Sequence, residues 1–372
     1  FGVYSADHVR QVNGFREGYE GAQDWDLAMR ISELVPASSI RHIPFILCHR
    51  RAVIGSTALS ASNATDTKCA QFATIRDHFK RINLAVNISY TDNKVWKIQQ
   101  RIDSPKPQVD IIIPTRNQAN FLKKCLDSVL LKTKYLNYEI LVVNNQSDDP
   151  RILDYFDEIQ NDNRITMLEY DHPFNYSAIN NFAALQAKGD VLVFLNNDIE
   201  VISPQWLDEM IGLAIQPGIG AVGAMLYYPN DTIQHAGVIL GMKGIAGHIY
   251  YGSPRGTIGQ RGRVRLTQNF SAITGACMAV DKGKFLSVGS FNKTQLGIAY
   301  NDIDLCIRLI KAGYRNVWTP HAELYHHESL SREYENTSEK LARFKSEADY
   351  LINQWADIIA NDPAYNLNLS IS

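Results

Sequence analysis

The chain has 372 residues, of which 45% are hydrophobic and 20% are charged. This length predicts about two domains, and the composition is that of an ordinary globular protein, which excludes collagen-like, coiled-coil and long disordered chains. The 37 Lys and Arg residues nearly balance the 39 Asp and Glu residues, for a net charge of −2. Because this balance lacks the basic excess of a general nucleic-acid binder, no nucleic acid is expected as a partner.

Sequence features typical of membrane insertion or of disulfide bonding are weak throughout the chain. The longest strongly apolar runs, such as residues 191–195, are too short to span a bilayer, and no signal peptide opens the sequence. Five scattered cysteines include no C-x-x-C pair, so we expect small buried apolar residues rather than disulfides or a zinc site. These features favour the reducing cytoplasm, with at most a peripheral position at the inner face of a membrane. The chain begins at Phe1 rather than Met, and we interpret it as a piece of a longer polypeptide.

An internal repeat relates the two ends of the sequence. Residues 12–15 (VNGF) and 23–31 (QDWDLAMRI) echo residues 288–291 (VGSF) and 301–309 (NDIDLCIRL), and each copy continues to a histidine, His49 or His326. Only the later copy is preceded by the strands and polar loops of residues 109–198. We therefore expect residues 1–60 to be the truncated C-terminal part of a preceding, similar domain.

The remaining elements are expected in the following order. Residues 61–107 hold a helix at 69–81, extended structure at 86–100 and a stiff Pro-containing connector at 104–108. Buried strands are predicted at 109–114, 138–143, 165–170 and 191–195, and helices at 120–131, 150–161, 176–188 and 339–359, the last within a C-terminal helix and tail at 336–372. Alternation of strands and helices predicts an α/β fold whose parallel sheet is covered by helices.

Polar side chains follow the predicted strands where ligands bind in such sheets. The clusters lie at residues 115–117, 144–149 and 196–198, and ligands sit beyond the carboxyl ends of parallel strands. Asp198 follows a buried strand, where it is placed to bind a hard cation that neutralises a diphosphate. Asn and Asp also gather in helix caps and turns for local reasons, and from this motif alone that alternative stays open.

From about residue 108 to residue 335 the chain resembles a family 2 glycosyltransferase. The resemblance rests on ordered motifs: IIIPTRN (111–117), EILVVNNQSD (139–148), PFNYSAINN (173–181), NND (196–198), QHAG (234–237), TGAC (274–277), NDIDLC (301–306) and HHES (326–329). It is nearest to bacterial enzymes that build surface glycans, often with two transferase domains in tandem. The resemblance implies a GT-A fold, a Rossmann-like nucleotide-diphospho-sugar transferase with a mixed, mainly parallel sheet, over residues 108–335.

The same resemblance implies roles for individual residues. The nucleotide would be held by Pro114, Thr115 and Arg116, with Asn144 facing the base and with Asn196 and Asn197 at the position of the family's D-x-D motif. Asp198 would bind a divalent metal, Mn²⁺ or Mg²⁺, with His326 completing the coordination or touching the diphosphate. Asp302 would be the catalytic base. In the truncated repeat, Asp24 matches Asp302 and His49 matches His326. No nucleotide-binding half accompanies them, and we interpret both as inactive here.

The chemistry of transfer agrees with these roles. An inverting transfer needs a carboxylate to take the proton of the acceptor hydroxyl, and it needs positive charge on the departing diphosphate. Asp302 is also a helix N-terminal acid favoured by the macrodipole, which is compatible with the catalytic role. Three amides replace the family's usual acids: Asn144, Asn196 and Asn301. A donor or acceptor pocket is expected near His235, Thr274, Gly275 and Asn301.

The sequence thus predicts a metal-dependent, inverting glycosyltransferase. It would move a hexose from a nucleotide diphosphate sugar, with UDP-glucose or UDP-galactose favoured and dTDP-rhamnose next, to a hydroxyl of a surface polysaccharide or glycoprotein glycan. The alternatives are a sugar nucleotidyltransferase, disfavoured because the loop after the first strand has no glycine, and a non-catalytic binding or assembly module. The exposed half-domain at residues 1–60 further predicts a partner surface, such as that of a homo-oligomer. An arginine-containing loop at 252–265 is either a lid or a surface loop.

Overall fold

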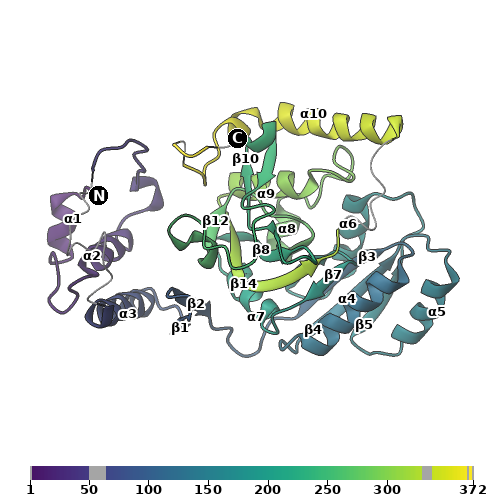
Figure 1. The fold of residues 1–372 in the computed structure, drawn as a ribbon, viewed down its shortest axis with the longest axis horizontal. Helices are drawn as coiled ribbons and strands as arrows, with labels where there is room; N and C mark the ends of the chain where they lie inside the picture. Colours follow the sequence, from purple (N-terminus) through teal and green to yellow (C-terminus); the bar gives the residue numbers. More distant parts are fainter. Residues whose placement is uncertain (1, 50–63, 329–336, 367, 371–372) are drawn as a thin grey trace. The chain divides into compact units, whose positions relative to one another are not determined.

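The computed structural model describes residues 2–49, 64–328, 337–366 and 368–370 (Figure 1). It comprises two compact units, Phe1–Arg101 and Ile102–Ser372. The division lies beside the connector expected at residues 104–108. The helix expected at 69–81 belongs to the first unit.

The first unit is helical and ends in a β-hairpin. Its elements are α1 (Ala6–Gln11), α2 (Gln23–Ser32), the short 3-10 helix η1 (Ala37–Ser39), α3 (Ala64–Arg81), β1 (Val86–Tyr90) and β2 (Trp96–Gln100). The antiparallel pairing of β1 with β2 confirms the extended structure predicted for residues 86–100. Residues 40–49 carry exposed apolar side chains, among them Phe45 and Ile46, and form neither helix nor strand.

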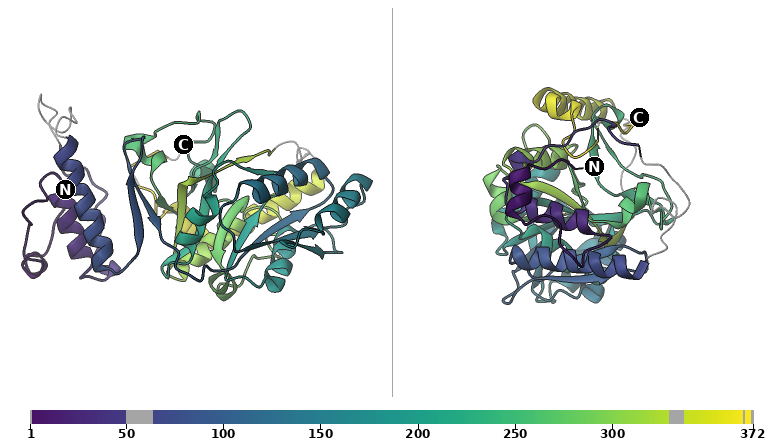
Figure 2. Two further views of the ribbon diagram at one scale, coloured as in Figure 1. Left: turned by 90° about the horizontal axis from the view of Figure 1, so that it is seen from below. Right: turned by 90° about the vertical axis from the view of Figure 1, so that its left-hand side faces the viewer.

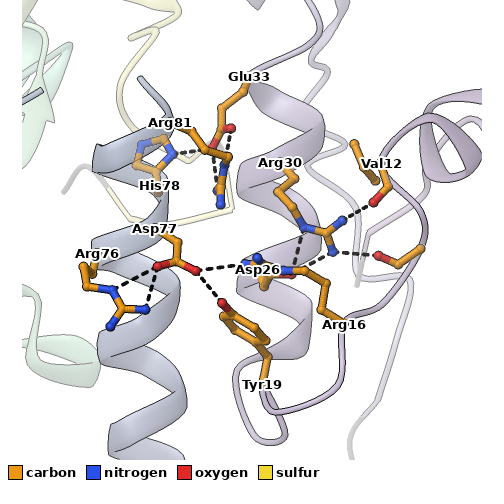
Figure 3. A network of polar contacts seen from close by, with 11 residues as sticks. Val12, Arg16, Tyr19, Asp26, Arg30, Glu33, Arg76, Asp77, His78 and Arg81 are labelled. Atoms are coloured by element: carbon orange, nitrogen blue, oxygen red, sulfur yellow. Dashed lines mark hydrogen bonds and ion pairs between the residues drawn. The ribbon is translucent and has the colours of Figure 1, made fainter. Parts of the chain in front are cut away.

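A buried ion pair holds α2 against the turn before it (Figure 3). Arg30 donates to Asp26 one helical turn away, and its guanidinium also donates to the carbonyl oxygens of Val12 and Gly14. Arg16 donates to the same Asp26 carboxylate. The charge of Asp26 is therefore matched by two guanidinium groups, as burial of a carboxylate requires.

The second unit contains the same arrangement, which gives the internal repeat a structural counterpart. Arg308 donates to Asp304 one turn away in α9 (Asn301–Lys311) and to the carbonyl oxygen of Val288. The turns before the two helices also agree. Gly14 N donates to Val9 O at 2.9 Å, and Ser290 N donates to Phe285 O at 3.0 Å; Gly14 and Ser290 both have positive φ.

A large mixed sheet forms the centre of the second unit (Figures 1 and 2). Its strand order is β12-β14-β8-β13-β6-β3-β4-β5, with β7 beside β14 and β9 beside β8. Strands β6, β3, β4 and β5 are mutually parallel, as predicted, whereas β13 runs antiparallel to both β6 and β8. The bounds of these strands are β3 (Val109–Thr115), β4 (Tyr138–Asn144), β5 (Ile165–Glu169), β6 (Val191–Leu195), β7 (Ile199–Val201), β8 (Ile219–Tyr227), β9 (Ile233–His235), β12 (Gln268–Phe270), β13 (Cys277–Asp281) and β14 (Arg315–His326).

Helices cover both faces of this sheet because its strands bury side chains on both sides. Ile111 and Ile113 of β3 join one apolar core, and Ile112 between them joins the other. The first core is completed by α4 (Ala119–Lys132), α5 (Pro150–Ile159) and α7 (Trp206–Ala214). The second is completed by α6 (Tyr176–Gln186), α8 (Lys282–Ser287), α9 and α10 (Ser338–Ala360). A small hairpin of β10 (Val238–Leu240) and β11 (Ala246–His248) follows β9, and short 3-10 turns lie at η2 (Met242–Gly244) and η3 (Gln260–Arg265).

Two further expectations concern membranes and cysteines. No helix in the described part of the chain combines the length and the apolar character that crossing a bilayer requires. Cys125, Cys277 and Cys306 are buried and unpaired, as predicted. The prediction of burial was wrong for Cys48 and Cys69, which are exposed. Cys48 lies in the segment at residues 40–49, which forms neither helix nor strand.

Candidate active site

The predicted polar clusters meet at the carboxyl ends of β3, β4 and β6. Asn197 donates its amide N–H to the hydroxyl of Thr115 at 2.9 Å, which joins the loop after β6 to the end of β3. Pro114 is partly buried beside Thr115, and Arg116 is exposed. Asn144 ends β4, where its amide donates to Glu169 at 2.8 Å and its Oδ1 accepts from Ser147 N at 3.1 Å. The residues expected to bind the nucleotide therefore line one edge of the sheet.

Asp198 and His326 face each other next to this edge. Asp198 follows β6, His326 ends β14, and Asp198 Oδ1 lies 3.1 Å from His326 Nε2. Both side chains are almost fully buried. Asn196 Nδ2 lies 3.4 Å from the same imidazole nitrogen, and His327 N donates to Asp198 O at 2.9 Å. A carboxylate and an imidazole therefore lie side by side at this edge.

The donor set of this pair is compatible with a divalent cation. Carboxylate oxygen and imidazole nitrogen both ligate Mn²⁺, and Mg²⁺ sites commonly use one or two protein carboxylates together with substrate phosphates. Within the described ranges, no group of three or more His, Cys, Asp and Glu side chains is arranged to hold a metal by itself. Asp198 and His326 therefore fit a site in which the remaining ligands come from a diphosphate and from water.

Asp302 lies in the first turn of α9, against the loop that precedes β13. Its Oδ2 accepts from Gly275 N and its Oδ1 accepts from Ile303 N, both at 2.8 Å. Burial raises the pKa of the Asp302 carboxyl, and the hydrogen bonds from Gly275 and Ile303 oppose that rise. The neighbouring Asp304 is neutralised by Arg308 and also accepts from Trp355 Nε1 at 2.8 Å. Asp302 is thus the carboxylate of this pair that remains available for chemistry.

Backbone contacts connect the predicted metal ligands to the loop that holds Asp302. Asn196 N donates to Ala276 O at 3.0 Å, so the end of β6 is tied to the loop that contains Gly275. Tyr176 of α6 donates its hydroxyl to Gly275 O at 3.0 Å. In the same loop, Thr274 Oγ1 accepts from Ala276 N at 3.3 Å. The predicted diphosphate edge and the predicted base therefore form one continuous site.

The other pocket candidates have different surroundings. His235 is fully buried; its Nδ1 lies 3.2 Å from His248 Nδ1, and its Nε2 has no hydrogen-bond partner among the described residues. Burial and the neighbouring His248 lower the pKa of His235 well below its usual value, which keeps the ring neutral. Asn301 is buried and donates to Ile298 O at 2.9 Å, which secures the loop before α9.

Sequence reasoning gave no role to several polar residues that the structure brings to the site. Gln234 bridges His326 and Glu328. Glu200 accepts from Lys124 and faces His327. Burial raises the pKa of Glu200, but these contacts outweigh burial and lower the pKa below its usual value. The motif around residue 234 and the histidine pair at 326–327 were visible signals, but their connection depends on long-range pairing of strands.

Comparisons with known proteins agree with this architecture. Residues 110–285 match the family model described as glycosyl transferase family 2. An uncharacterized protein, y4gI of Sinorhizobium fredii, is 43% identical over 377 residues, and the O-antigen biosynthesis protein RfbC of Myxococcus xanthus is 38% identical over 387 residues. Both alignments cover 100% of this chain, which spans only 41% and 28% of those two relatives.

A solved structure shows the same fold. The crystal structure of GalNAc-T7 with UDP, GalNAc and Mn²⁺ aligns with a TM-score of 0.56 and 15% sequence identity, covering 74% of this chain and 53% of that one. At this identity the likeness concerns the fold alone. Residues 110–285 thus match glycosyl transferase family 2, and the second unit, in which they lie, has the GT-A fold.

Proposed function

We propose that the second unit transfers a hexose, with inversion, from a nucleotide diphosphate sugar to a hydroxyl of a growing glycan. The observation that carries this proposal is the continuity of the site. The Asp302 carboxylate, held by two backbone N–H groups, is joined through the Gly275 loop and Asn196 to the edge where Asp198 and His326 face each other. Similarity to an O-antigen biosynthesis protein favours a surface glycan as the product, and a glycoprotein glycan is the second acceptor class.

Asp302 would act as the general base. Hydrogen bonds from Gly275 and Ile303 occupy one lone pair on each carboxylate oxygen and leave another free to accept the proton of the acceptor hydroxyl. As the oxygen of the acceptor hydroxyl forms its bond to the anomeric carbon, the bond from this carbon to the diphosphate breaks on the opposite side. The raised pKa of Asp302 strengthens it as a base, because the ideal catalytic pKa lies near the operating pH.

Asp198 and His326 would hold a divalent metal, Mn²⁺ or Mg²⁺. When bound, this ion supplies positive charge to the departing diphosphate. The two ligands are buried, and Asp198 directly precedes β7, which pairs with the end of β14 that carries His326, so little reorganisation is needed to present them together. GalNAc-T7 was crystallised with Mn²⁺ and UDP, which supports a metal of this class in the same fold.

The nucleotide would lie along Thr115, Asn144 and Asn197, beside Pro114 and Arg116. Asn144 directs its amide N–H to Glu169 and its oxygen to Ser147 N, so this side chain is already fixed before the base arrives. Fixed amides and carboxylates suit recognition of a pyrimidine edge through hydrogen bonds. We favour UDP-glucose or UDP-galactose as the donor, with dTDP-rhamnose next.

We also propose that residues 1–60 correspond to the C-terminal part of a preceding glycosyltransferase-like domain. The support is the repeated helix with its Asp–Arg pair and its preceding turn. In that correspondence Asp24 takes the place of Asp302, and it is exposed in the first unit.

Donor hydrolysis tests the proposed transferase most directly. UDP, dTDP and GDP sugars would be incubated with the chain, with and without Mn²⁺, beside the variants Asp198→Ala and Asp302→Asn. Asp127→Asn, an exposed change on α4, is the matched control. We expect metal-dependent hydrolysis of one donor class, lost in both site variants and kept in the control. Absence of turnover and of nucleotide-dependent thermal stabilisation would instead favour a non-catalytic binding module.

A further inference from the structure

Gln234 lies at the centre of a short polar chain behind the proposed metal ligands. It belongs to β9 and is buried, with 4% of its surface exposed. Its Oε1 lies 2.9 Å from His326 Nδ1, and its Nε2 donates to a carboxylate oxygen of Glu328. One amide therefore connects an imidazole to a carboxylate, both from the segment that ends β14.

The contact with Glu328 fixes which way this amide points. An ionised carboxylate can only accept hydrogen bonds, so the NH₂ group of Gln234 must face Glu328 and the carbonyl oxygen must face His326. That oxygen can only accept, which requires a proton on His326 Nδ1. In a neutral imidazole with Nδ1 protonated, Nε2 carries a lone pair.

Two side chains lie close to Nε2 of His326. Asp198 Oδ1 lies 3.1 Å away, and Asn196 Nδ2 lies 3.4 Å away. A lone pair and a carboxylate oxygen at such a separation need positive charge between them, which is either a second proton on Nε2 or a bound cation. Because both side chains are almost fully buried, water screens these charges poorly. The arrangement is therefore suited to a cation.

We infer that Gln234 is a positioning residue that, held by Glu328, directs the Nε2 lone pair of His326 together with Asp198 toward a divalent cation. The inference rests on the metal site of the proposed function and adds the residues behind it. Partners of this kind fix the tautomer and the ring orientation of a ligating histidine, and their loss typically weakens metal affinity about 10–100-fold.

Mn²⁺ binding tests the role of Gln234 without any need for turnover. The purified chain would be titrated with Mn²⁺ alone, and free ion would be measured by electron paramagnetic resonance. Gln234→Met keeps the approximate volume and removes both hydrogen bonds, and we expect it to weaken binding about 10–100-fold. Gln216→Met is the matched control, because Gln216 donates to a helix carbonyl of Gly212 and lies outside this chain of contacts; its affinity should equal that of the wild type.

Exchanging the amide and the carboxylate between residues 234 and 328 separates positioning from a merely structural effect. Gln234→Glu faces Glu328 with a second carboxylate and should also weaken binding. The double variant Gln234→Glu with Glu328→Gln restores the pattern, because residue 234 again accepts from His326 and residue 328 now donates to it. We expect its Mn²⁺ affinity to return to within about threefold of the wild type, while thermal melting reports that every variant is folded.

Each outcome bears on the inference separately from the transferase activity. Wild-type affinity in Gln234→Met, or a double variant no better than Gln234→Glu, would overturn it. The same holds if His326→Ala binds Mn²⁺ as the wild type does. Failure of donor hydrolysis with the expected Mn²⁺ series intact would count against the proposed function and would leave the role of Gln234 supported.

Discussion

The backbone N–H of Gly275 lies 2.8 Å from Oδ2 of Asp302 and fixes one edge of that carboxylate. The carbonyl oxygen of Gly275 is itself held by the hydroxyl of Tyr176 at 3.0 Å. The orientation of the proposed base therefore depends on a glycine that is bonded at both its N–H and its carbonyl. Residues of α6 and α9, distant in sequence, meet at this glycine.

The pH dependence of transfer should reflect the raised pKa of Asp302. The base is active when ionised, so activity is expected to fall as the pH drops through a pKa above the usual aspartate value, the direction that burial imposes. Initial rates measured against pH, with kcat and kcat/KM separated, check this expectation. Asp302→Asn should lower kcat by about 10²–10⁴-fold, whereas Asp127→Asn should keep the wild-type profile. An acid limb unchanged in residual Asp302→Asn activity would contradict the assignment.

Removal of the Tyr176 hydroxyl should reduce the rate more than it reduces donor binding. Tyr176→Phe loses the hydrogen bond to Gly275 O, an interaction that contributes about 1 kcal/mol, or roughly fivefold, if the whole effect is felt in the transition state. Steady-state kinetics should show a lower kcat with little change in the KM for the donor. Tyr350→Phe is the control. The hydroxyl of Tyr350 in α10 accepts from Asn292 in the loop before α9. Equal kinetic effects in the two variants would refute a specific role for Tyr176.

The two repeated Asp–Arg pairs should differ in their sensitivity to mutation. Arg308→Met leaves the buried Asp304 carboxylate without its guanidinium partner and should destabilise α9 by about 3–5 kcal/mol. Arg30→Met should cost less, because Arg16 still donates to Asp26 (Figure 3). Hydrogen exchange of the α9 and α2 amides measures the two effects locally, since a two-unit chain need not unfold in one step. A larger loss of protection in Arg30→Met would contradict this comparison.

Gly237 is expected to tolerate no side chain. Its φ is +108°, and a Cβ there would overlap the ring of Phe270, so Gly237→Ala combines backbone strain with overpacking at a cost of about 2–5 kcal/mol. Gly244→Ala is the matched control: its φ is +93°, but no atom lies within 4 Å of the added Cβ, so only the strain of about 1–2 kcal/mol applies. Urea unfolding of the two variants should give clearly different midpoints. Equal midpoints would show that Phe270 moves aside without cost.

The parallel half of the fold could be predicted because its strands are continuous apolar runs. Residues 109–114, 138–143 and 191–195 are buried on both faces, and each is followed by a polar cluster at the ligand edge. These local signals also located Asp198 and the residues around Thr115. The resemblance to a family then connected Asp302 and His326, which no periodicity relates to them.

The other half of the sheet, which mixes parallel and antiparallel pairs, could not be predicted from such signals. β14 contains Pro320, a residue that argues against a strand, and its pairing with β8 is interrupted between Trp318 and Glu323. β8 contains Gly220 and Gly223, and Ile273 and other side chains fill the space where Cβ atoms would stand. The contact of Gln234 with His326 joins residues 92 positions apart. It therefore depends on the register of strands that the sequence pattern does not predict.

The turn and helix that carry Asp24 and Asp302 have one more consequence, for the order in which the chain folds. Arg30 reaches Asp26, Gly14 and Val12 across separations of only 4, 16 and 18 residues, and Arg308 reaches Asp304 and Val288 across 4 and 20. Contacts of such low sequence separation close with little loss of loop entropy, whereas the pairing of β3 with β6 must bring together strands some eighty residues apart. We therefore expect each aspartate-bearing helix to form early with its turn, and in the second unit we expect the slower sheet to condense onto α9 and its turn.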